Sequence, residues 1–218
     1  MKIFRSILTA ALAVATLTAS AQDISYTVDV QSPKRPQTLS VKVMSNGSMT
    51  LMDPPAEGNA PFKILIDNVK NAQYMLTQNG DSKVAVRVDA FNEKAALEQS
   101  GKPKVEETKE IKLIDGMNCR KVTAETDATS TVMWVTDEAD VSYQDLFRVV
   151  NTNRNAPGAR NILPALNDLK GFPIEIVSTD KKTSEEVKVN IRNINREKLD
   201  AAMFSMDGYR VNDMRKIK

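Results

Sequence analysis

The sequence predicts an α+β domain dominated by an antiparallel sheet, with a few helices over one face of that sheet. Two observations support this fold class. Short segments in which β-branched or aromatic residues alternate with polar ones recur along the chain, separated by turn residues such as Asn46-Gly47 and Asn79-Gly80. Other segments space their apolar residues as a helix does, and begin at residues that cap helices, such as Asp89 and Ser142.

The strand pattern is clearest where apolar and polar residues alternate strictly. The expected strands are residues 24–28, 39–44, 49–52, 62–66, 73–77, 83–88, 111–113, 118–124, 131–136, 174–177 and 187–194. We expect 118–124 to pair with 131–136 with Val122 opposite Met133, which puts Trp134 on the face of Cys119. Both faces of this pair then carry apolar groups, as in a curved sheet whose concave side is filled by helices or by a ligand.

Helices are expected at four places. One begins at the Asp89 cap and is stopped by Gly101 and Pro103, and a second follows a capping-box-like pair, Ser142 and Asp145. The remaining two are an apolar stripe from Asn161 to Leu169 that ends at Gly171, and a short helical segment over residues 196–203. With no internal repeat or linker, we expect residues 22–218 to form a single domain.

The first 21 residues have the pattern of a secretory signal peptide. Lys2 and Arg5 precede an apolar run over residues 7–17, and Ala19-Ser20-Ala21 forms a cleavage site. The run is too short to favour a retained membrane anchor, and no cysteine follows it that could carry a lipid. We therefore expect a periplasmic or secreted protein with no transmembrane segment in the mature chain.

The charge balance argues against nucleic-acid binding, and the cysteine content excludes an internal disulfide. The chain has 30 Lys and Arg against 28 Asp and Glu, and loss of Lys2 and Arg5 makes the two counts equal. A neutral mature chain has no excess positive charge to attract nucleic acid. Cys119 is the only cysteine, so no internal disulfide can form and stability must come from packing.

No residue pattern predicts catalysis, a cofactor or a metal. The chain lacks histidine, so Cys119 has only Lys121 and Arg120 nearby in sequence to hold it as a thiolate, and a structural role is favoured. Four acids, Asp137, Glu138, Asp140 and Asp145, do not have the spacing of a calcium loop. Met49 and Met52, weighed as copper(I) ligands, lie three apart in a strand and so point to opposite faces.

Several segments, in this order, resemble a family of exported bacterial proteins catalogued as a domain of unknown function. They are Gln73–Leu76, Glu110–Val122, Val132–Thr136, Lys170–Ile174 and Phe204–Tyr209. Such families are similar to the lipoprotein-carrier (LolA/LolB-like) proteins. The resemblance covers roughly residues 65–212 and implies a half-barrel: a strongly curved antiparallel sheet with a few helices packed over its concave face. It implies no catalytic residues.

Two functions remain open. The first is a non-enzymatic carrier or sensor of a hydrophobic ligand, such as a lipid or acyl chain, bound in the concavity of the sheet. The residues expected to line its binding site are Tyr74, Met75, Met133, Trp134 and Phe204. The alternative is an envelope protein with a filled core that docks a protein partner through the loop 151–160 and the turn at Lys181-Lys182. An enzyme is the least favoured class.

Overall fold

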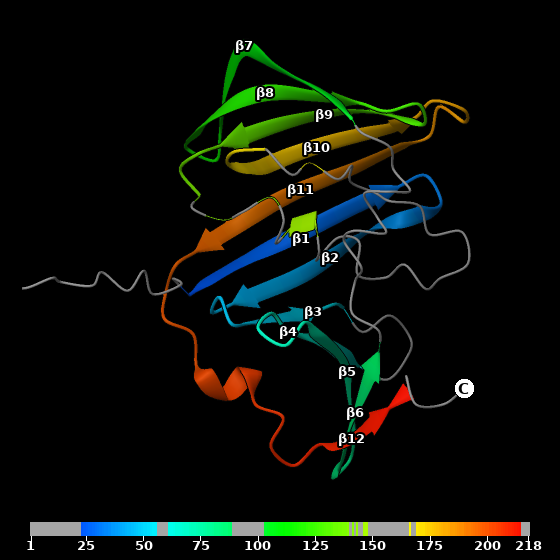
Figure 1. Ribbon diagram of the computed structural model, residues 1–218, viewed down its shortest axis with the longest axis vertical. Coiled ribbons are helices and arrows are strands. Elements are labelled where there is room, and N and C mark those ends of the chain that lie inside the picture. The colour runs from blue at the N-terminus through cyan, green and yellow to red at the C-terminus, as the bar shows by residue number, and fades with distance from the viewer. Residues whose placement is uncertain are drawn as a thin grey trace, which may run out of the picture.

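The computed structural model describes residues 23–55, 61–88, 103–139, 141, 143, 146–147, 166 and 169–214. In this part of the chain, twelve strands form one open sheet in the order β12-β6-β5-β4-β3-β2-β1-β11-β10-β9-β8-β7 (Figure 1). All neighbouring strands are antiparallel except β12 and β6, which are parallel. The strands are β1 (Ile24–Ser32), β2 (Arg35–Ser45), β3 (Met49–Asp53), β4 (Phe62–Asp67), β5 (Ala72–Asn79), β6 (Ser82–Val88), β7 (Lys104–Ile114), β8 (Met117–Glu125), β9 (Thr129–Thr136), β10 (Phe172–Asp180), β11 (Glu186–Asn195) and β12 (Arg210–Asp213).

The predicted α+β class is wrong, because the described chain is nearly all sheet. Leu166 and Leu169, taken from their spacing for part of a helix, have no helical backbone. The segment expected to be helical over 196–203 is irregular as far as Asp200, which is the N-cap of the 3-10 turn η1 (Ala201–Phe204). The helix expected at Asp89 lies outside the described residues, as does the loop 151–160, whereas Tyr143, Leu146 and Phe147 are helical.

The fold class was predicted wrongly because apolar residues at helical spacing were taken as evidence of a few helices, whereas they are residues buried against the sheet. The apolar residues at helical spacing, Leu146, Phe147 and Leu166, are indeed buried in the main hydrophobic cluster. Most members of that cluster, however, come from the strands themselves. Helix-like spacing therefore reports burial in both segments, but it corresponds to a helical backbone at Leu146 and Phe147 and not at Leu166.

The predicted hairpins and one predicted register are confirmed. Asn46-Gly47 and Asn79-Gly80 connect β2 to β3 and β5 to β6, with Gly47 and Gly80 at φ of 81° and 57°, where glycine meets no steric penalty. Val122 pairs with Met133, as expected from the alternation of the two strands. Strand β7 is much longer than the three residues expected, because its first half is rich in Lys and Glu and so resembles a loop.

Two segments far apart in sequence meet in the middle of the sheet. Strand β1 pairs with β11, which joins the meander β1–β6 to the meander β7–β11 (Figure 1). Asp29 on β1 is buried and accepts hydrogen bonds from Ser40 of β2, at 2.7 Å, and from Arg192 Nε of β11, at 2.6 Å. This charged group therefore ties three strands together at the junction.

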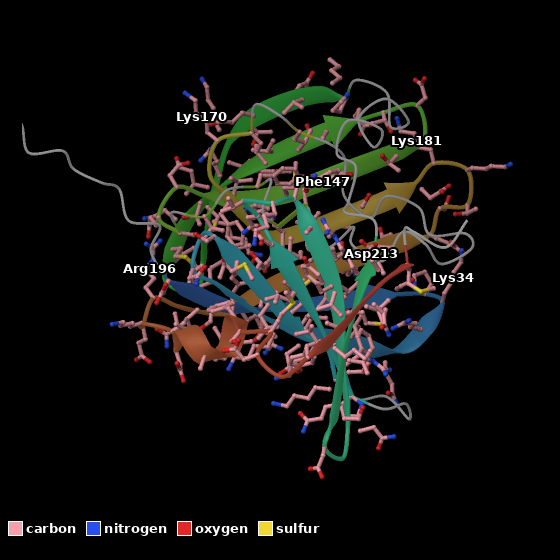
Figure 2. All side chains as sticks on the ribbon, turned by 60° about the horizontal axis from the view of Figure 1, so that its bottom comes forward. Lys34, Phe147, Lys170, Lys181, Arg196 and Asp213 are labelled. Carbon is pink, nitrogen blue, oxygen red and sulfur yellow. The ribbon has the colours of Figure 1, made fainter. Side chains whose placement is uncertain are left out.

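The sheet carries hydrophobic clusters on opposite faces. We call the face that holds Val43, Met133 and Ile176 the inner face, and the opposite one the outer face. The larger cluster covers the inner face from β8 to β4 and includes Phe147, which lies near the middle of the sheet in Figure 2. The smaller cluster lies on the outer face of β2–β6 beneath η1. Each face of β2–β4 is thus buried by a different part of the chain.

Candidate functional site

The structure places the five residues predicted to line a binding site in different surroundings. Met133 is fully buried on the inner face, whereas its neighbour Trp134 lies on the outer face and is only partly buried. Tyr74 and Phe204 are both buried in the outer-face cluster. Met75 lies on the inner face and is 40% exposed. The fold thus brings Tyr74 and Phe204 together. Of the five predicted residues, Met75 has the most exposed side chain.

Trp134 belongs to a charged patch on the outer face of β7–β10. It pairs with Lys121 of β8 and with Glu175 of β10. The Lys112 Nζ lies 5.5 Å from the centroid of the Trp134 ring and 2.7 Å from Glu175 Oε2. The indole ring is therefore covered by an ammonium group that is itself held by a carboxylate.

A row of apolar side chains crosses the inner face at the other end of the sheet. The register pairs Met52 of β3 with Ile64, Ile64 with Met75, and Met75 with Val86 of β6. We call this row the inner-face ladder. Exposure is greatest at Met75, because Met52 is buried in the main cluster and Ile64 and Val86 are both partly buried. The ladder is thus a continuation of the hydrophobic core that the described chain leaves partly open.

The ladder reaches the edge of the sheet at β12. The parallel register places Asn212 beside Val86 and Arg210 beside Val84, which itself pairs with Thr77 on the inner face. Arg210 and Asn212 are both exposed. A cation and an amide therefore border the open end of the ladder.

Of the ladder and its rim, only Met75 was predicted from the sequence as a site residue. Ile64 and Val86 were expected in strands, but their alignment with Met75 depends on the register of three strands. Arg210–Asp213 was not expected to be a strand, because it is short and polar. The signal that could have drawn attention to Ile64 and Val86 is the apolar alternation of Phe62–Ile66 and Lys83–Val88, which both flank Gln73–Thr77.

At the opposite end of the inner face, ion pairs and a hydrogen bond of Arg120 hold the segment after β9 against the segment before β10. The Arg120 guanidinium contacts Glu107 Oε1 at 3.0 Å, Asp137 Oδ2 at 2.8 Å and the Lys170 carbonyl at 2.6 Å. Gly171 follows at φ 84°, and a Cβ there would lie 2.6 Å from the Thr136 carbonyl oxygen. This network fixes the connections after β9 and before β10, which is a structural role.

Cys119 has the surroundings of a structural thiol. Its side chain is fully buried, and its Sγ donates to the Met117 carbonyl at 3.6 Å. Burial raises the pKa of the Cys119 thiol, and the negative charges of Glu138 and Glu175 raise it further. The thiolate that a nucleophile or a metal ligand requires is therefore disfavoured.

The acids that were considered for calcium make protein contacts instead. Asp137 binds Arg120, and Glu138 Oε1 accepts from the Asn118 backbone N–H at 3.1 Å. Asp140 and Asp145 lie outside the described residues. Within the described ranges, no group of three or more His, Cys, Asp or Glu side chains is arranged to hold a metal ion. The same part of the chain contains no helix long and apolar enough to cross a membrane.

In the described residues, the chain is nearly all sheet, built on one open, almost entirely antiparallel sheet with a partly exposed apolar row at one end. The chain belongs to the family described as Domain of unknown function (DUF4412), which it matches over residues 31–208. This agrees with the resemblance that its segments show to a family of unknown function. A search among curated proteins found no match.

Similar solved structures have low sequence identity. PNGF-II is 14% identical with a TM-score of 0.46, and the match covers 89% of this chain but 32% of that one, so the chain spans about a third of PNGF-II. A LolA superfamily protein from Nitrosomonas europaea is 13% identical with a TM-score of 0.35, covering 86% of this chain and 91% of that one. A DUF1329 family protein from Desulfovibrio piger is 11% identical with a TM-score of 0.29, covering 87% and 91%. We base no inference about ligand or activity on these likenesses.

Proposed function

We propose that this protein is an exported, non-enzymatic binding protein of the cell envelope. In this proposal it holds the hydrocarbon part of a ligand, such as a lipid or acyl chain, on the inner-face ladder. The export signal expected in residues 1–21, which lie outside the described residues, supports the compartment. The raised pKa of the buried Cys119 supports a role without chemistry at the only cysteine.

The observation that carries the proposal is the exposure of Met75 within the ladder. Met75 is 40% exposed, although its cross-strand neighbours Ile64 and Val86 are apolar and the row continues into the buried cluster at Met52. Binding pockets are mostly apolar, and each methylene removed from water contributes about 0.8 kcal/mol. The flexible thioether of Met75 can adapt to hydrocarbon chains of different shape.

The proposal is tested by isolating the protein with its native ligand. The full chain is expressed with its own leader, recovered from the periplasm of a Gram-negative host, and examined by native mass spectrometry and organic extraction. We expect a stoichiometric adduct that extracts as lipid. A clean apo mass, together with no uptake of lipid on incubation, would contradict the proposal.

A pair of lysine substitutions then locates the ligand. Met75→Lys places an ammonium under the bound hydrocarbon, so lipid occupancy is expected to fall by roughly tenfold or more. Trp134→Lys is the matched control, since Trp134 lies on the outer face beside Lys112 and is expected to keep the adduct. Urea unfolding confirms that both variants are folded. Loss of lipid from Trp134→Lys alone would place the ligand on the outer face.

The second candidate function, docking of an envelope protein partner, is favoured by the edge strand β7. Ile111 and Leu113 are 74% and 68% exposed on this strand, which has no neighbouring strand on its free side among the described residues. The turn at Lys181-Lys182 is exposed as well, although Lys181 already binds Glu125 at 2.6 Å. The double variant Ile111→Lys with Leu113→Lys would lose a cross-linked partner if docking is the function, and would keep its lipid if the ladder is the binding site.

A further inference from the structure

The chemistry at the rim of the ladder indicates the kind of head group that its ligand carries. The ladder ends beside Asn212, and the neighbouring row, Phe62, Thr77 and Val84, ends beside Arg210 (Figure 1 shows β12 next to β6 at one edge of the sheet). Both rows lie on the inner face, because paired residues of neighbouring strands share a face. The apolar surface of the inner face is therefore bordered at β12 by the guanidinium of Arg210 and the amide of Asn212.

Arg210 is free to bind a ligand. Among the described residues its guanidinium has no hydrogen bond or ion pair, and its side chain is exposed. The two rows contain no acidic residue. By contrast, Arg87, one residue along β6 from Val86, faces the outer side and lies 5.9 Å from the Tyr74 ring. The unpaired positive charge of Arg210 therefore lies on the same face as the exposed Met75, whereas the guanidinium of Arg87 lies on the opposite face.

We propose that the occupant of the ladder is a free long-chain fatty acid, with its carboxylate on Arg210 and its chain along Val86, Met75 and Ile64. This inference rests on the proposed function. An arginine fork matches a carboxylate in a bidentate geometry, and the Asn212 amide can donate a further hydrogen bond. The four strand-to-strand steps from β3 to β12 span roughly 19 Å at about 4.8 Å each, which suits an extended chain of palmitoyl length.

The test compares two probes with the same length of chain but different head groups, an anionic carboxylate and a neutral hydroxyl. Radiolabelled palmitate and radiolabelled hexadecanol are bound to the delipidated full chain by equilibrium dialysis. We expect palmitate to bind more tightly than hexadecanol. In Arg210→Gln the affinity for palmitate is expected to fall roughly fivefold, the size of an exposed ion pair, and the affinity for hexadecanol to stay unchanged. Arg210→Lys is expected to restore part of the difference.

Lys83→Gln is the matched control. Lys83 is on β6, like Val84, but faces the outer side, where its Nζ lies 5.7 Å from the Tyr209 ring. Its loss is expected to leave the affinity for palmitate unchanged. Equal binding of palmitate and hexadecanol, insensitive to Arg210→Gln, would overturn the fatty-acid inference and leave the proposed function standing. Binding of neither probe, together with a clean apo mass of the native protein, would overturn both.

Discussion

At the scale of single residues, Cys119 shows how a chemically suggestive side chain takes a structural role. It pairs with Lys112 across β7 and β8, yet the net effect of its surroundings is to raise its pKa, because burial and three nearby carboxylates outweigh the lysine. A thiol with these properties reacts slowly, because only the thiolate is a nucleophile. The absence of histidine from the sequence already favoured this role.

The reactivity of Cys119 follows directly from its burial and its raised pKa. We expect the folded protein to resist alkylation by iodoacetamide at neutral pH and to react fully once it is unfolded in urea. The rate is expected to begin rising only above the pH range in which a model thiol reacts, since the pKa is shifted upward. Mass spectrometry of the alkylated protein measures this. Rapid stoichiometric alkylation of the native chain would show that Cys119 is accessible.

At the scale of elements, close packing between β9 and the start of β10 depends on a glycine. Gly171 has φ 84°, and a Cβ there would meet the Thr136 carbonyl oxygen and Asp137 Oδ1, both at 2.6 Å. The Thr136 oxygen is a backbone atom of β9 and cannot easily move away, whereas the Asp137 side chain is 71% exposed and is held by a 2.8 Å contact with Arg120. Gly116, in the turn from β7 to β8, has a similar φ of 82° but open space around its Cβ position.

These two glycines form a matched pair of variants. Gly116→Ala is expected to cost about 1 kcal/mol, the penalty of a left-handed backbone for alanine. Gly171→Ala carries the same penalty and a steric clash, so we expect a loss of about 3 kcal/mol in the free energy of unfolding. Urea unfolding monitored by circular dichroism gives both values. Equal losses in the two variants would show that the Gly171 contact relaxes without cost.

At the scale of the whole molecule, the sheet buries apolar residues on both faces. The inner-face cluster holds most of the core, and the outer-face cluster is covered by Phe204 of η1 and by the partly buried Leu199, Met206 and Tyr209. Asp200 begins η1 by accepting a hydrogen bond from the Ala202 backbone N–H at 2.9 Å. Phe204, which was expected to line a ligand site, lies in this cover.

Phe204 therefore stabilises the fold from the outer face. Phe204→Ala is expected to lower the free energy of unfolding by about 3 kcal/mol, because it leaves a cavity over the outer-face cluster. Met203→Ala, at a neighbouring position that is 38% exposed, is expected to cost less than about 1 kcal/mol. Neither change should affect lipid occupancy on the inner face. If Phe204→Ala released bound lipid without loss of stability, Phe204 would belong to the ligand site.

Features that depend on neighbouring residues could be predicted from the sequence alone. Alternation of apolar and polar side chains located most strands, the two Asn-Gly turns placed their hairpins, and the pairing of Val122 with Met133 followed from the shape of one hairpin. The lack of histidine and the single Cys119 limited the chemistry. Each of these conclusions requires only local geometry or residue type.

The residues that cover the sheet and the position of the candidate site depend on tertiary contacts. The spacing of Leu166 and Leu169 reports burial, and a buried segment on a sheet need not be helical. The inner-face ladder depends on the combined register of β3, β4, β5 and β6, and its rim depends on β12 returning to pair with β6. Such non-local pairings determine which side of the sheet each residue faces and which neighbours it meets, and no local pattern in the sequence contains that information.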